Sequence, residues 1–176
     1  MKTPYIIRLA NAICILFLLV ICYPQITIAQ RSGHVIGGGY RHPLGYFAVT
    51  LSTDAILLSV GNQQYYYDSG VYYLDYGSGY EVVPPPTGVV VPYLPKGYET
   101  VAVGDADYYY YGGAFYINQG SSFRVIPAPV GAVVTDVPEG AREQSVKGVH
   151  YLLYNYTYYK PITQNGRDAY EMVQVN

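Results

Sequence analysis

Cysteine, tryptophan and charge are all scarce in this sequence. It has two cysteines and no tryptophan, and Asp, Glu, Lys and Arg together make up 12% of its residues. Both cysteines, Cys14 and Cys22, lie near the N-terminus, so the rest of the chain has no thiol for a disulfide, a thiolate metal site or a cysteine nucleophile. The 10 basic residues against 12 acidic ones leave no basic patch, and nucleic acid is therefore not expected as a partner.

The N-terminus has the parts of a secretory signal peptide. Basic residues precede an apolar run at residues 13–21, and small residues occupy positions 27 and 29. We expect residues 1–29 to be the signal peptide, with cleavage between Ala29 and Gln30. The mature protein is then exported, to the periplasm, the outer membrane or the extracellular space.

Two alternatives for this segment are a retained membrane anchor and a lipoprotein signal. An anchor needs roughly 20 apolar residues, and Pro24 follows a run that is shorter than this. A lipoprotein signal would use Cys22, but the preceding residue is Ile21, where such signals need a small side chain. A stable transmembrane anchor is therefore not expected.

Beyond a glycine-rich arm at residues 30–42, tyrosine dominates the chain and recurs with a fixed period. Residues 43–85 superpose on residues 86–128 without a gap, which aligns tyrosine runs, glycine turns and proline seams at a spacing of about 43 residues. A looser third copy occupies residues 129–176. Self-similarity at such a period indicates tandem repeats of one supersecondary unit.

Within one repeat, short β-favouring runs alternate with turns rich in glycine, asparagine and aspartate. In the second copy the expected strands are residues 89–91, 98–103, 108–111, 114–117 and 123–126. Short strands separated by such turns are typical of an antiparallel meander. No segment outside the signal peptide has a helical period, although the polar residues 139–147 fit either a helical turn or a loop.

The third copy departs from the other two in its second half. It needs extra residues around positions 163–166, and its last strand is expected at residues 169–175. It also lacks the proline run that follows the other copies at residues 84–86 and 127–129. Those runs fit stiff connectors at the repeat seams, because proline has no N–H for a central strand; a proline-rich recognition ligand is the alternative.

The sequence therefore predicts an all-β fold of three tandem antiparallel β-meander repeats. Two geometries are open: separate small SH3-like barrels, or repeats stacked into one continuous β-layer. Propeller blades have a similar length, but three blades do not close a ring. Each repeat is too small to bury a large core, so neighbouring repeats are expected to stabilise one another.

One stretch of the first repeat carries a recognisable pattern. Tyrosines at residues 65–67 are followed by Gly70, an aromatic pair at 72–73, and Gly-Tyr-x-Val-Val-x-Pro-Pro-x-Gly at 79–88. This arrangement resembles a family of uncharacterised exported proteins of Gram-negative bacteria, and the resemblance covers most of residues 43–134. It implies the compartment and the protein class, and it brings no assigned activity.

The tyrosines are the main candidates for binding. Consecutive strand side chains point to opposite faces, so Tyr108 and Tyr110 are expected on one face and Tyr109 and Tyr111 on the other. The second face is covered by the next repeat, or it forms an exposed aromatic platform for an envelope glycan or an envelope protein. The candidate binding residues are Tyr66, Tyr73, Tyr109, Tyr111 and Tyr116.

Other polar residues give no clear catalytic or metal site. Asp105 and Asp107 fit turn formation better than acid–base catalysis, which needs two carboxylates in unlike environments. His34 and His42 flank the glycines of the arm, but a dedicated metal site needs three or four ordered ligands. No metal and no cofactor are expected.

The leading hypothesis is a non-enzymatic structural or binding module of the bacterial cell envelope. The alternative is a self-assembling matrix or surface protein that associates through tyrosine-rich strand edges, since unpaired sheet edges associate readily. An enzyme is the third hypothesis. It would require a cleft that brings together His150, Asp107 and Asp136.

Overall fold

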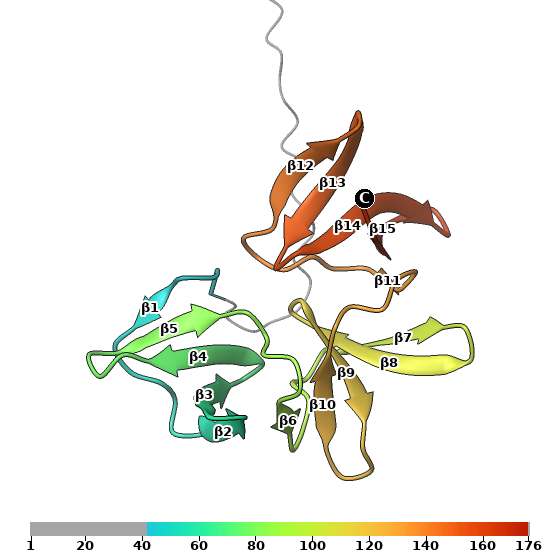
Figure 1. Ribbon diagram of the computed structural model, residues 1–176. Coiled ribbons are helices and arrows are strands. Elements are labelled where there is room, and N and C mark those ends of the chain that lie inside the picture. Colours follow the sequence, from blue (N-terminus) through green and yellow to red (C-terminus); the bar gives the residue numbers. More distant parts are fainter. Residues whose placement is uncertain (1–41, 176) are drawn as a thin grey trace, which may run out of the picture. The chain divides into compact units, whose positions relative to one another are not determined.

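The computed structural model describes residues 42–175, and every regular element in this range is a β-strand. The strands form three five-stranded sheets in which all neighbours are antiparallel (Figure 1). The all-β prediction with three tandem repeats is thereby confirmed. The expected signal peptide, its cleavage site at Ala29 and Gln30, His34 and nearly all of the glycine-rich arm lie outside the described residues.

Each sheet is built from one contiguous part of the chain. The first contains β1 (Phe47–Ala48), β2 (Ile56–Val60), β3 (Gln63–Asp68), β4 (Val71–Asp75) and β5 (Tyr80–Val83). The second contains β6 (Val90–Val91), β7 (Glu99–Val103), β8 (Ala106–Tyr111), β9 (Ala114–Asn118) and β10 (Phe123–Ile126). The third contains β11 (Val133–Val134), β12 (Arg142–Val146), β13 (Val149–Tyr154), β14 (Thr157–Gln164) and β15 (Arg167–Val173).

The strand order within a sheet is a meander with its first strand added to the far edge. In the first sheet the order is β1-β5-β4-β3-β2, and the other two sheets repeat it. The short first strand pairs with the last strand at equivalent positions: Phe47 opposite Glu81, Val90 opposite Arg124, and Val133 opposite Glu171. No strand of one sheet pairs with a strand of another within residues 42–175.

The third sheet accommodates its extra residues by lengthening one hairpin. Strands β14 and β15 pair from Tyr158 opposite Val173 to Gln164 opposite Arg167. Asn165 and Gly166 form the tight turn, both with positive φ, as Asn-Gly does in two-residue hairpins. The extra residues lie where the sequence placed them.

This longer hairpin contains a proline inside a strand. Pro161 lies opposite Tyr170 in the β14–β15 pair, whereas the pairing of β14 with β13 ends at Tyr159 opposite Leu152. Beyond Tyr159, β14 thus has a neighbour on one side only. A strand tolerates proline at such an edge, because the N–H that proline lacks has no partner strand to reach.

Most of the polar segment at residues 139–147 is a strand, where its composition suggested a helical turn or a loop. Residues Arg142–Val146 form β12, which pairs with β13 along its whole length. Four of its five side chains are exposed. An edge strand that faces water has no apolar alternation to reveal it, so only the alignment with β2 and β7 could have identified it.

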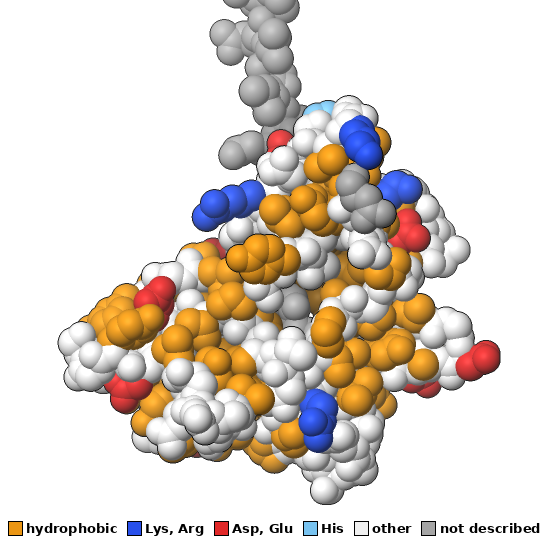
Figure 2. Space-filling model, viewed as in Figure 1, with side chains coloured by type: hydrophobic (Ala, Val, Ile, Leu, Met, Phe, Trp, Pro, Cys, Tyr) orange, Lys and Arg blue, Asp and Glu red, His pale blue; other side chains and the backbone are white. Residues whose placement is uncertain are grey.

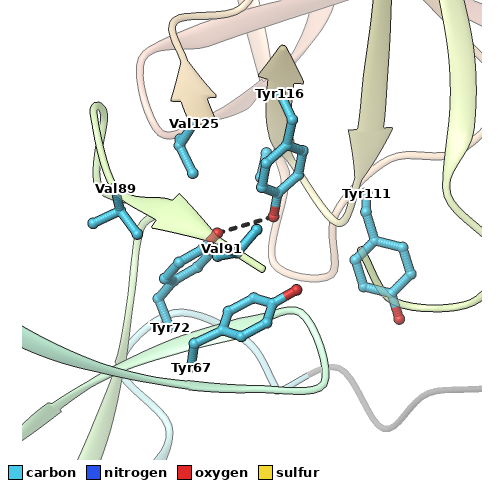
Figure 3. Close-up of a cluster of buried hydrophobic side chains, with 8 residues drawn as sticks. Tyr67, Tyr72, Val89, Val91, Tyr111, Tyr116 and Val125 are labelled. Atoms are coloured by element: carbon cyan, nitrogen blue, oxygen red, sulfur yellow. Dashed lines mark hydrogen bonds between the residues drawn. The ribbon is translucent and has the colours of Figure 1, made fainter. Parts of the chain in front are cut away.

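Two hydrophobic cores lie between consecutive sheets. The first core joins sheets one and two, and its buried residues are Tyr67, Tyr72, Val89, Val91, Tyr111, Ala114, Tyr116 and Val125 (Figure 3). The second core joins sheets two and three, and its buried residues are Val101, Tyr110, Phe115, Ala132, Val134, Tyr154, Tyr159 and Met172. The repeats therefore stabilise one another through shared cores, as their small size predicted.

The middle sheet is buried on both faces because its strands alternate. On β8, Tyr109 and Tyr111 belong to the first core, whereas Tyr108 and Tyr110 belong to the second. This confirms the predicted alternation of the tyrosine run. A tyrosine run suits a sheet with two covered faces, because the ring fills the core and the hydroxyl can reach a polar partner at its margin.

Candidate binding site

The five tyrosines singled out from the sequence do not form one exposed surface. Tyr116, Tyr111 and Tyr73 are 0%, 5% and 5% exposed, so their rings are not available as a platform. Tyr66 and Tyr109 are half-buried. Tyr109 packs against the first core, and Tyr66 lies beside Tyr73 on the first sheet, where the two are paired across β3 and β4.

The buried hydroxyls of the first core have well-defined partners. The Tyr72 and Tyr116 hydroxyl oxygens lie 3.0 Å apart (Figure 3), and the Tyr67 hydroxyl donates to the Tyr93 carbonyl at 3.4 Å. Burial raises the pKa of Tyr67, Tyr72 and Tyr116 well above the usual value. These groups are neutral at physiological pH and act as structural hydrogen-bonding groups, not as acids or bases.

The first sheet has one further buried tyrosine, at its other face. Burial raises the pKa of Tyr73 to about 12, with a smaller contribution from the nearby Asp68 carboxylate. Tyr66 contacts Tyr80 edge to face, with ring centroids 5.1 Å apart. The His42 ring stacks on the Tyr46 ring, with ring centroids 3.9 Å apart. In the described structure this histidine therefore packs against an aromatic ring.

The candidate catalytic groups remain separate from these clusters. Asp105, Asp107 and His150 are exposed on β-turns and strand starts of two different sheets, and Asp136 is half-buried. Residues 42–175 hold no group of three His, Cys, Asp or Glu side chains suited to a metal ion. The same part of the chain has no helix of the length and hydropathy needed to cross a membrane.

An open cavity of about 780 Å³ lies at the connectors between repeats. Its walls come from the two connectors that follow β5 and β10, the β13–β14 turn, and the end of β15. The residues that line it are Tyr65, Leu74, Val83, Pro84, Pro85, Pro86, Thr87, Gly113, Ala114, Val125, Ile126, Pro127, Ala128, Val130, Asn155, Tyr156, Thr157, Tyr158, Met172, Val173, Gln174 and Val175.

Among residues 42–175, the cavity lining contains no charged side chain. Its apolar wall comes mainly from proline, valine and alanine, and its aromatic rings come from Tyr65, Tyr156 and Tyr158. Hydroxyl and amide groups are supplied by Thr87, Asn155, Thr157 and Gln174. An apolar pocket with a few polar groups is the usual form of a small-ligand site, and this volume lies in the usual range.

Tyr156 is the most exposed aromatic residue of this lining. Its side chain is 95% exposed, and its φ of 61° is one that side-chain-bearing residues rarely adopt. It follows Asn155, also with positive φ, in the two-residue turn between β13 and β14. The hairpin turn therefore presents this ring to solvent at the edge of the cavity.

The sequence patterns do not predict this cavity. The proline runs at residues 84–86 and 127–129 fit connectors or a peptide ligand, whereas in the structure both contribute wall residues. The available signal was that both runs recur at repeat boundaries, where segments distant in sequence can meet. Figure 2 shows one face on which apolar side chains form broad areas and charged groups are few and scattered.

Residues 21–176 match the model of a family described as "Family of unknown function (DUF6515)". No curated protein matches the chain. No solved structure matches it either.

Proposed function

Because the chain belongs to this family of unknown function, we propose its role from its own geometry: a non-enzymatic binding module of the bacterial cell envelope. The ligand is an uncharged part of an envelope glycan, held in the cavity at the repeat connectors. The observation that carries this proposal is a cavity of about 780 Å³ whose lining combines tyrosine rings, amides and hydroxyls with no charged group.

The chemistry of the lining favours a neutral saccharide. Tyrosine rings can stack on the apolar faces of sugar rings, while hydroxyl and amide groups exchange hydrogen bonds with sugar hydroxyls. A phosphate or a nucleic acid would instead need cationic partners, and the lining has none. The absence of a carboxylate or a histidine in the lining also supports binding without catalysis.

The N-terminal segment and the family resemblance support the proposed compartment. Basic residues, the apolar run at 13–21 and the small residue Ala29 support export by a cleaved signal peptide. The tyrosine-run and proline pattern supports a Gram-negative envelope, either in the periplasm, at the outer membrane or outside the cell. An envelope protein is the second ligand class, since the proline-rich and valine-rich wall also suits an apolar peptide.

A retention assay with purified mature protein, residues 30–176, tests the proposal. The protein is applied to insoluble cell-wall glycan and to neutral envelope polysaccharide, and bound protein is measured against concentration. We expect saturable retention that soluble neutral oligosaccharides compete away and that 0.5 M salt, on the order of a 4–5 Å screening length, leaves nearly unchanged. Absence of retention on every glycan would overturn the glycan proposal.

Substitution of Tyr156 gives the clearest test of the cavity in this assay. Tyr156→Ala should weaken retention about tenfold, which corresponds to the loss of about 1.4 kcal/mol from one stacked ring, and should leave folding intact because the ring is 95% exposed. Tyr76→Ala is the matched control, since Tyr76 is 59% exposed and lies outside the cavity lining. Equal effects of the two variants would contradict the cavity as the binding site.

A further inference from the structure

Both interfaces between repeats are built around the same contact, in which a glycine of one repeat lies beneath a tyrosine and a proline of the next. A Cβ atom at Gly113 would lie 2.6 Å from Tyr154 Cε1 and 2.7 Å from Pro138 Cγ. Both neighbours come from the third repeat. Only a residue without a side chain leaves room for this contact.

The first interface has the same contact one repeat earlier. A Cβ atom at Gly70 would overlap the Tyr111 ring and would lie 2.7 Å from Pro95 Cγ. Gly70 and Gly113 each hold the second position of a tight hairpin turn, with φ of 94° and 89°. The tyrosine and proline therefore act as a knob, and the turn glycine acts as its socket.

In the third repeat, the position of the socket glycine carries a side chain. The residue aligned with Gly70 and Gly113 is Tyr156, in the equivalent turn between β13 and β14. Its φ of 61° keeps the turn left-handed although the residue carries a large side chain. A tyrosine there takes up the space in which the knob of a following repeat would lie.

In the first repeat, polar residues stand at the two positions of the knob. Asp68 aligns with Tyr111 and Tyr154, and Ser52 aligns with Pro95 and Pro138. The Ser52 N–H donates a hydrogen bond to the Asp68 carboxylate at 2.9 Å, so these two polar residues pair with each other. A carboxylate buried against another repeat would lose its hydration without gaining a partner.

The rest of the surface of the third sheet is still suited to stacking. In the third sheet, Tyr151, Leu153 and Tyr158 align with Tyr65, Tyr67 and Tyr72, three residues that the first sheet contributes to the first core or packs against it. Repeats that present complementary faces in this way continue head to tail unless a terminal repeat prevents it. The three residues that differ from the repeat pattern, Ser52, Asp68 and Tyr156, lie where a terminal repeat must prevent this head-to-tail stacking.

We propose that Ser52, Asp68 and Tyr156 close the two ends of the array to a second copy of this chain. The interface that joins the repeats inside the molecule is thereby denied to neighbouring molecules. The inference depends on the two internal interfaces, and it holds whether or not the cavity binds a glycan. It also opposes self-assembly through this face, which was the alternative that the sequence left open.

Complementary variants test this directly. Tyr156→Gly opens the socket, and the double variant Ser52→Pro/Asp68→Tyr restores the knob. We expect each variant alone to sediment as a monomer, and an equimolar mixture to form a 1:1 complex in analytical ultracentrifugation. A chain with all three changes should form head-to-tail oligomers whose mean size grows with protein concentration.

Matched controls separate the socket from the backbone. Asn155→Gly relaxes the same left-handed turn but keeps the Tyr156 ring, and Asp68→Asn removes the charge without adding a ring. Neither should associate with the complementary variant. Circular dichroism and thermal unfolding establish that each variant is folded, and the single variant Asp68→Tyr replaces the double variant if Ser52→Pro prevents folding.

Two results would overturn the proposal. One is a mixture of folded complementary variants that stays monomeric at a protein concentration of hundreds of micromolar. The other is head-to-tail association of the unaltered chain that Tyr156→Gly does not strengthen. Either result would mean that these three residues do not control access to the ends of the array.

Discussion

The two cores of this protein are built on the same backbone and differ at a few polar positions. In the first core, Tyr72 and Tyr116 share a hydrogen bond of 3.0 Å between their hydroxyls. In the second, the aligned residues are Phe115 and Tyr159. Within residues 42–175 the buried Tyr159 hydroxyl makes no well-aligned hydrogen bond, although the Tyr110 hydroxyl lies near enough to influence its pKa. Phe115 has no hydroxyl with which to repeat the Tyr72–Tyr116 hydrogen bond.

The ring packing shows how closely the two cores correspond. The ring centroids of Tyr67 and Tyr72 lie 5.0 Å apart with an interplanar angle of 49°. Those of Tyr110 and Phe115 lie 4.9 Å apart with an interplanar angle of 48°. Tyr67 and Tyr110 also donate to the aligned carbonyls of Tyr93 and Asp136. The hydrogen bond is thus lost although this ring pair keeps its geometry; the Tyr93 ring that contacts Tyr67 in the first core is replaced by Asp136 in the second.

The second interface has a polar contact elsewhere that the first one lacks. The Glu99 carboxylate accepts hydrogen bonds from the Thr135 N–H at 3.0 Å and from the Thr135 hydroxyl at 2.9 Å. Ile56 takes the place of Glu99 in the first interface, where it packs against the first core. Both interfaces therefore keep a tyrosine-to-carbonyl hydrogen bond, but only the first adds a buried hydroxyl pair, and the second adds a polar contact at its exposed margin.

Alkaline pH is expected to have the largest effect, and it should act on both cores. Burial raises the pKa of Tyr67, Tyr72, Tyr110, Tyr116 and Tyr159 above the value of 10.0. The unfolded chain then loses protons first, so stability is complete below pH 10 and falls as pH rises above it. Each such tyrosine removes about 1.4 kcal/mol per pH unit in this range.

Cooperative unfolding is therefore expected within about one to two pH units above pH 10, given a typical stability of about 5–15 kcal/mol. Circular dichroism and tyrosinate absorbance, recorded on the same titration, should change together. A gradual rise of tyrosinate absorbance with an unchanged fold would show that the buried hydroxyls are accessible to hydroxide, which would contradict the two closed cores.

Filling a socket glycine should have the next largest effect, at either interface. Gly113→Ala places a methyl group against Tyr154 and Pro138, and we expect a loss of about 3 kcal/mol or more in the free energy of unfolding. Gly120→Ala is the control, since its φ of 86° is nearly that of Gly113 but nothing lies within 4 Å. It should cost only the left-handed strain, about 1–2 kcal/mol.

Chemical denaturation measures both variants, and Gly70→Ala extends the test to the first interface. Similar losses for Gly70→Ala and Gly113→Ala would mean that the two interfaces rely equally on the socket. If Gly113→Ala cost no more than Gly120→Ala, the close approach of the third repeat to this glycine would be wrong.

Removing one hydroxyl should distinguish the two cores. Tyr116→Phe leaves the buried Tyr72 hydroxyl without its partner and should cost about 1–2 kcal/mol. Tyr159→Phe removes a hydroxyl that makes no well-aligned hydrogen bond in the described part of the chain, and its expected effect is between zero and a gain of about 1 kcal/mol. Urea unfolding at pH 7 measures the difference, and equal losses for the two variants would remove the distinction drawn between the cores.

Adding a hydroxyl to the second core should have the smallest effect and the opposite sign. Phe115→Tyr places a hydroxyl beside Tyr159, as Tyr72 places one beside Tyr116, and we expect a gain of about 0.5–1 kcal/mol. The gain should disappear, or become a loss, in the double variant Phe115→Tyr/Tyr159→Phe. A double-mutant cycle at equilibrium isolates the hydroxyl pair from the packing of the added atom.

The repeat period, the strands and most turns were predictable from the sequence, because each depends on local patterns. Alternation also indicated correctly that Tyr109 and Tyr111 share a face. It could not show that the face is covered, since Tyr66 and Tyr109 occupy aligned positions and only Tyr109 belongs to an interface between two repeats. Whether a strand face is core or surface depends on which sheets lie on either side.

The candidate site was harder to predict for the same reason. Its lining combines Pro86, Pro127, Tyr156 and Val175, which come from distant parts of the sequence. No local period relates them. The short strand β1 was also difficult, because its pairing with β5 brings together the two ends of one repeat.

Pro161 protects the third sheet from a different kind of unwanted partner, an added β-strand. The outer part of β14 extends past the end of its pairing with β13, and an unpaired strand margin can attract the backbone of any passing chain. A proline there withholds one N–H from such a ladder, and the exposed Lys160 beside it adds a charge that an incoming strand would have to accommodate. The longest hairpin of the molecule thus carries its own safeguard against aggregation through added strands.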